Sequence, residues 1–100
     1  MEAEKLERIM ARVKEIPSMK LNDFVTMEEK LGEIAVGENG APRIKFSQLR
    51  FMTALMISKL GDEYKVTPEE VGDLPPNHPI FGEVMRKAAD EGVPTGAIGG

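Results

Sequence analysis

Apolar residues recur every three or four positions along much of the chain, and this spacing lines one face of a helix. The clearest example is the segment 2–16. Its apolar face carries Leu6, Ile9, Met10, Val13 and Ile16. Charged residues occupy the opposite face, and Pro17 then stops the segment because proline lacks the amide hydrogen that a helix needs. The pattern predicts an amphipathic helix from Glu2 to Ile16.

Two further helices are predicted from residues that typically begin and end helices. Asn22 can accept hydrogen bonds from the free amides of a first turn, and Gly32 can adopt the left-handed conformation that follows a last turn. In the same way, Ser47 can cap a longer helix that runs to Leu60 and ends at Gly61. This longer helix is apolar on most of its circumference, with Leu49, Phe51, Met52, Leu55, Met56, Ile57 and Leu60. We therefore expect it to lie at the centre of the core.

A short fourth helix is predicted after residue 66. The hydroxyl of Thr67 and the carboxylate of Glu70 have the spacing of a capping box, in which each side chain accepts from the backbone amide of the other residue. Pro68 suits the first turn of a helix, where its missing amide hydrogen is not needed. Gly72 ends this helix after little more than one turn.

A last helix is expected from Ile80 to Glu91, with Gly92 as its end. Its buried face is predicted to hold Ile80 or Phe81 together with Val84, Met85 and Ala88. Residues 93–100 contain three glycines and one proline and show no helical pattern. Packing is not expected to offset the entropy of ordering them, which predicts a flexible tail.

Between the second and third helices the helical pattern is interrupted. The segment 33–42 is the longest predicted loop, and within it Asn39 and Gly40 favour positive φ and a tight turn. Residues 43–46 alternate polar with apolar side chains and can form a minor strand. With no internal repeat or linker, the sequence predicts an all-α, single compact domain of four or five short helices over residues 1–92.

Composition limits the classes of function. The net charge of -4 disfavours nucleic-acid binding, which depends on lysine and arginine neutralising phosphates. The chain has no cysteine, which excludes disulfides, thiol nucleophiles and thiolate metal sites. No apolar run approaches the roughly 18 to 20 residues of a membrane span, and the acidic start from Met1 to Lys5 is unlike a secretory signal. We expect a cytoplasmic protein that binds neither nucleic acid nor membranes.

Residues that carry chemistry are few and scattered. His78 is the only histidine, whereas a zinc site gathers three or four ligands, so its ring is expected to cap a backbone amide or to face solvent. Carboxylates occur as adjacent pairs such as Glu28 and Glu29, whose side chains diverge by about 100° on a helix. No segment has the spacing of a calcium-binding or phosphate-binding loop. The sequence predicts no catalytic residue, no cofactor and no metal ion.

Seven methionines are present, and their flexible thioethers suit either an irregular core or an adaptable binding surface. Helical spacing places four of them in the predicted interior, namely Met10, Met27, Met52 and Met56. Met19, which lies close to Pro17, and Met85 on the last helix are candidates for an exposed groove that binds a partner.

Three short stretches carry a resemblance to a known family. Residues 19–32 read MKLNDFVTMEEKLG, residues 44–49 read IKFSQL, and residues 66–72 read VTPEEVG. Over about residues 19–74 the chain resembles the tail assembly chaperones of long-tailed bacteriophages. The helices at 2–16 and 80–91 have no counterpart in this pattern.

The resemblance implies a small, helical, non-enzymatic protein in the host cytoplasm. Such a protein binds the tape measure protein and keeps it soluble while tail tube proteins assemble around it. The glycine-rich end at 96–100 is then a plausible junction to a frameshifted, longer form. No catalytic residue carries over, and the candidate contact residues are the apolar side chains Phe24, Met27, Phe51, Met52 and Phe81.

Two other functions remain open at this point. A head-tail connector or another virion adaptor would form a closed ring instead of a transient complex. A small regulator of the transcriptional or antitoxin type is the other alternative, because the short helices around Thr67 and Pro79 can imitate a helix-turn-helix. The acidic charge argues against the regulator.

Overall fold

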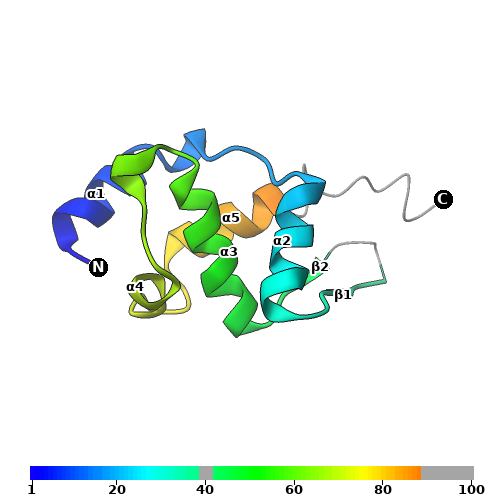
Figure 1. Ribbon diagram of the computed structural model, residues 1–100. Helices are drawn as coiled ribbons and strands as arrows, with labels where there is room; N and C mark the ends of the chain where they lie inside the picture. The colour runs from blue at the N-terminus through cyan, green and yellow to red at the C-terminus, as the bar shows by residue number, and fades with distance from the viewer. Residues whose placement is uncertain (39–41, 89–100) are drawn as a thin grey trace.

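Helices make up most of the computed structural model, which describes residues 1–38 and 42–88 (Figure 1). In chain order, with η marking a 3-10 helix, the elements are α1 (Ala3–Ala11), η1 (Val13–Glu15), α2 (Leu21–Leu31), β1 (Ala35–Val36), β2 (Pro42–Arg43), α3 (Phe46–Ser58), η2 (Asp62–Tyr64), α4 (Pro68–Gly72) and α5 (Pro79–Arg86). The two strands form one short antiparallel pair, with Ala35 opposite Arg43 and Val36 opposite Pro42. The predicted all-α class is confirmed. Within the described ranges, no helix is long and apolar enough to cross a membrane.

Helix α3 lies at the centre of the molecule, as predicted. It contacts α2, α4, α5 and η2, and Figure 1 shows it crossing the middle of the fold between them. Its residues Met52, Met56 and Ile57 are fully enclosed. Removing apolar surface from water stabilises a fold by roughly 25 cal/mol per Å². Packing against the enclosed side chains of α3 is therefore what stabilises the surrounding helices.

Each of the other α-helices contributes enclosed side chains to the same core, namely Ile9, Met27, Val71, Ile80 and Val84. On α5 the choice between Ile80 and Phe81 is resolved because both are buried. The prediction that Met19 contributes to an exposed groove is wrong, since its side chain is only 2% exposed. The segment that joins η1 to α2 packs against the core and encloses this methionine.

The first helix is shorter than predicted. It ends at Ala11, because Arg12 leaves the helical path with φ -116° and ψ 15°. The guanidinium of Arg12 donates to the carbonyl of Leu60 at 3.4 Å and lies 5.0 Å from the centre of the Tyr64 ring. These contacts fasten the end of α1 to the region after α3, and Ile16 is enclosed beyond the 3-10 turn that follows.

The predicted caps of the second and third helices are each wrong by two residues. Asn22 lies inside α2, which begins at Leu21, and the carboxylate of Asp23 accepts from the amide of Lys20 at 2.8 Å. Ser47 lies inside α3, where the side chain of Gln48 likewise accepts from the amide of the preceding cap residue at 3.0 Å. In both helices a side chain in the first turn reaches back and satisfies the amide of the cap residue, which is one of the two hydrogen bonds of a capping box.

Two helix boundaries agree with the prediction. The amide of Glu70 donates to the hydroxyl of Thr67 at 3.1 Å, and the amide of Thr67 donates to the Glu70 carboxylate at 3.1 Å, which completes the capping box of α4. This bond from the Thr67 amide is the main cause of the lowered pKa of Glu70. Gly32 follows α2 with φ 92°, in the left-handed region that favours glycine.

The segment between α2 and α3 differs in part from the prediction. The strand lies at 42–43 and not at 43–46, because Phe46 already belongs to α3. The predicted turn at Asn39 and Gly40 lies outside the described residues. So do the predicted end of the last helix at Glu91 and the tail at 93–100.

The central position of α3 predicts the effect of shortening one of its enclosed side chains. Met52→Ala leaves a cavity in the core, so we expect the free energy of unfolding to fall by about 2 to 4 kcal/mol. Leu21→Ala is the control, because Leu21 is 74% exposed and its truncation should change stability by less than about 0.5 kcal/mol. Urea unfolding followed by circular dichroism measures both. Equal effects of the two substitutions would contradict the central role of α3.

Candidate functional site

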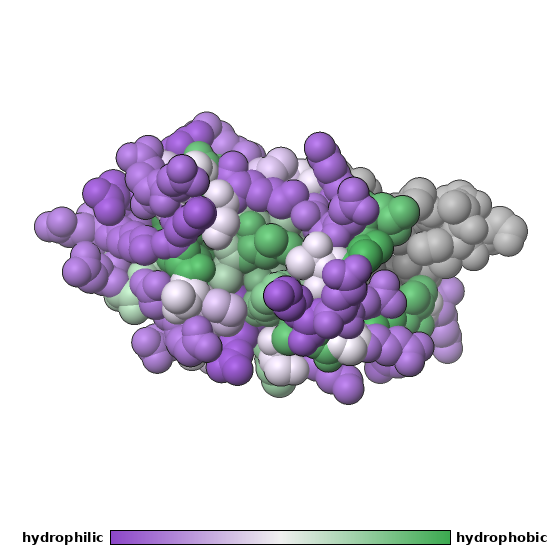
Figure 2. Space-filling model, in the orientation of Figure 1, coloured by the Kyte–Doolittle hydropathy of each residue, from purple (hydrophilic) through white to green (hydrophobic). Residues whose placement is uncertain are grey.

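Exposed apolar surface is concentrated in one stretch of the chain. Among the described residues, the large apolar side chains classed as exposed are Leu21, Val25, Leu31, Val36 and Phe46. All of them belong to α2, β1 or the first turn of α3. Figure 2 shows apolar surface among hydrophilic side chains, much of it on the side where α2 and the strands lie. Phe46 is the most exposed of the set, at 80%.

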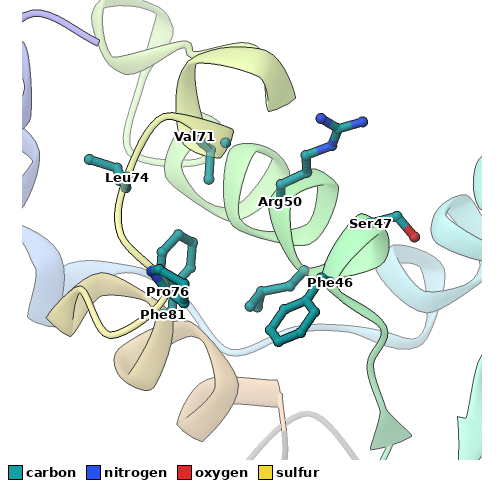
Figure 3. Close-up of a pocket in the computed structure, with 9 residues that line it drawn as sticks. Phe46, Ser47, Arg50, Val71, Leu74, Pro76 and Phe81 are labelled. Carbon is teal, nitrogen blue, oxygen red and sulfur yellow. The ribbon is translucent and has the colours of Figure 1, made fainter.

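Phe46 stands beside an apolar groove of about 300 Å³. The groove lies between α3, α4, the connection after α4, and the start of α5 (Figure 3). Its apolar lining residues are Phe46, Leu49, Val71, Leu74, Pro76 and Phe81. Figure 3 shows the Phe46 ring approaching from α3, with Pro76 and Phe81 on the other side of the groove. Its volume lies at the low end of the roughly 300 to 1,000 Å³ of small-molecule sites, so it suits one or two bulky side chains.

Local interactions hold the far wall of the groove in place. Nδ1 of His78 accepts from the amide of Ile80 at 3.2 Å and so caps α5, which is one of the two roles expected for this histidine. The ring of His78 also meets the ring of Phe81 edge to face, with the centroids 6.5 Å apart. His78 therefore helps to fix the aromatic side chain that forms this wall.

Ion pairs tie α5 and α2 to the rest of the fold. Glu83 on α5 is 9% exposed and accepts from Lys14 at 3.0 Å and from Arg86. The hydrogen bond from Arg86, and then the one from Lys14, lowers the pKa of Glu83. Asp23 on α2 meets the ammonium group of Lys59 at 2.8 Å. These carboxylates are engaged in structural pairs, which leaves neither of them free to act as a catalytic base.

One edge of the groove is basic. Arg50 lines it from α3, and in Figure 3 its guanidinium points away from the apolar rings. A Cβ atom at Gly72 would lie 3.6 Å from Cδ and 3.7 Å from Nη1 of Arg50, so this side chain reaches across toward the end of α4. Elsewhere in the described part of the chain, no group of three or more His, Asp or Glu residues is placed to hold a metal ion. The arrangement is suited to holding an apolar side chain at a basic edge.

This geometry is the main evidence on function. No family model, curated protein or solved structure matches the chain. The resemblance to tail assembly chaperones consequently remains a prediction.

The predicted contact residues do not form one surface. Met27 and Met52 are fully enclosed in the core and present no surface to a partner in this conformation. Phe24 and Phe51 are half-buried against the core, and Phe51 lines a separate, shallower hollow of about 180 Å³. Of the five, Phe81 lines the apolar groove.

The other apolar residues of the groove were not predicted as contacts, and they are Phe46, Leu49, Val71, Leu74 and Pro76. The pattern assigned Phe46 to a strand, and it treated the prolines after Leu74 only as the end of a helix. The position of Phe46 in the first turn of a helix was no signal of exposure, because Phe81 in the first turn of α5 is buried. The sequence alone did not show that α4 and α5 leave a groove beside it.

The ion pairs of Glu83 predict a pH dependence of stability. Because the pKa of Glu83 is lowered in the fold, its contribution is present above the ordinary value of 4.5 and is lost as the pH falls through the lowered value. Glu83→Gln should therefore unfold more easily than wild type by about 1 kcal/mol at pH 7, and by less in acid, once the pH has fallen through the lowered pKa of Glu83.

Thermal unfolding at several pH values tests this, with Glu28→Gln as the control. Glu28 is exposed and makes no ion pair within the described ranges, so its substitution should have little effect at either pH. The ion-pair account would be contradicted if the difference in unfolding temperature between Glu83→Gln and wild type were the same in acid as at pH 7.

Proposed function

We propose that this chain is a non-catalytic protein-binding domain that acts as a phage tail assembly chaperone. Its role is to hold an apolar segment of the tape measure protein in solution during tail assembly. The observation that carries the proposal is the apolar groove with Phe46 exposed beside it. Burying an exposed aromatic side chain contributes roughly 1.5 to 3 kcal/mol, so a partner that covers Phe46 gains affinity there.

The resemblance and the groove point to the same part of the chain. Residues 44–49 and 66–72 carry two of the three similar stretches, and they supply Phe46, Leu49 and Val71 to the groove. Two of the three similar stretches thus contribute apolar side chains to the groove. This coincidence supports the proposal independently of the size or helical content of the chain.

The character of the groove favours a peptide over a small molecule. Its lining is largely apolar and aromatic, with Ser47 and Arg50 as its polar side chains. A small-molecule site needs several converging polar groups to fix its ligand. Protein interfaces instead concentrate binding energy in a few aromatic and arginine residues at their centre. Phe46, Phe81 and Arg50 are residues of these types in one place.

The test is co-expression with the tape measure protein encoded in the same phage genome. We expect the partner to stay soluble and to co-elute with this chain in size-exclusion chromatography. Phe46→Ser should lower the recovered complex at least severalfold, since it removes an anchor without disturbing the core. Leu21→Ser, at a comparably exposed residue, is the matched control and should recover it.

Two outcomes would contradict the chaperone function. One is a partner that stays insoluble beside a folded chain. The other is a chain that elutes alone as a closed ring, which is the behaviour of a connector.

A further inference from the structure

Three cations cluster in the sequence around the start of α3, and one of them lines the groove. Arg43 ends β2, Lys45 is the cap residue of α3, and Arg50 lines the groove, and all three are exposed. Within residues 1–38 and 42–88, no carboxylate lies within ion-pair distance of any of them. This cluster occurs in a chain whose net charge is -4.

Lys45 does not stabilise the helix that it caps. The N-terminal end of a helix carries a partial positive charge, so anions there are favourable and cations are not. The first turn of α3 contains no acidic residue to offset Lys45. The positive charge of Lys45 therefore costs local stability, which a bound anion can relieve.

The opposite wall of the groove does not neutralise the cluster. Glu70 caps Thr67 and lies 3.8 Å from the ammonium group of Lys5. Asp73, which follows the lining residue Gly72, lies 3.9 Å from the amino group of Met1. Both carboxylates therefore have cationic partners on α1 or just before it.

We propose that the groove binds an acidic peptide segment, with one bulky apolar side chain in the groove and neighbouring carboxylates on Arg50, Lys45 and Arg43. This inference rests on the proposed protein-binding function and adds the chemistry of the partner. The apolar contact supplies affinity, and the charges supply selectivity and a faster approach. A basic segment with the same apolar anchor is rejected, because like charges then meet at the basic edge.

The experiment uses two short synthetic peptides with the same central phenylalanine, one flanked by glutamates and the other by lysines. Binding is measured by fluorescence polarisation at low and high ionic strength. The glutamate peptide should bind at least about tenfold more tightly at low ionic strength, and salt should reduce the difference.

Reversing the charge of Arg50 tests most directly whether the groove selects acidic peptides. Arg50→Glu should weaken binding of the glutamate peptide by about two- to fivefold and strengthen binding of the lysine peptide. Arg8→Glu is the matched control, because Arg8 is an exposed cation on α1 and its reversal changes the net charge equally. Phe46→Ser should weaken binding of the glutamate peptide at least about tenfold, and Leu21→Ser should not.

Several results would overturn the inference. They are equal binding of the two peptides, equal effects of Arg8→Glu and Arg50→Glu, and binding that survives Phe46→Ser. A fourth is a concentration-dependent dimer, detected by sedimentation, that both Phe46→Ser and Leu21→Ser abolish. It would assign the groove to α2 of a second copy, which carries Leu21 and Val25 beside Glu28 and Glu29.

The peptide assay and the co-expression assay test the two proposals separately, so one proposal can fail while the other stands. If the glutamate peptide binds as expected but the tape measure protein is not solubilised, the acidic-peptide site stands and the chaperone assignment falls. If the tape measure protein is solubilised equally by wild type and Arg50→Glu, and the peptides bind equally, the charge selectivity falls and the chaperone assignment stands.

Discussion

The enclosure of α3 is the constraint on which the rest of this fold depends. The helix is apolar on most of its circumference, so one neighbour cannot cover it, and α2, α4 and α5 pack around it from different directions. Met52, Met56 and Ile57 are consequently shielded from water. At the first turn the enclosure is incomplete. Phe46 is exposed to solvent there, and the groove lies beside it.

The core and the candidate site are therefore parts of one arrangement. Val71 is fully enclosed and also lines the groove, and Phe81 lines it while only 8% exposed. The position of α5 depends on the cap formed by His78 and on the ion pairs of Glu83. A change that loosens α5 will alter the groove as well as the stability, so only substitutions at exposed positions such as Phe46 and Arg50 report on binding alone.

Much of the helical architecture follows from the sequence, because periodicity and the capping box at Thr67 depend on neighbouring residues. The errors at Asn22 and Ser47 have a tertiary cause. Asp23 also pairs with Lys59, and the Gln48 side chain donates to the carbonyl of Glu33, contacts that a local pattern does not contain. The candidate site was harder to predict. Residue type marks a side chain as apolar, but only packing decides whether a neighbour covers it, as at Met52, or leaves it open, as at Phe46.

Amide hydrogen exchange measured by NMR tests the central claim most directly. If α3 is the element on which the others pack, the amides from Met52 to Ile57 should exchange only through global unfolding, with a free energy equal to that of urea unfolding. The amides of α1 and of the short strand pair should exchange through smaller, local openings. Exchange from α3 that is as fast as exchange from α1 would contradict the account.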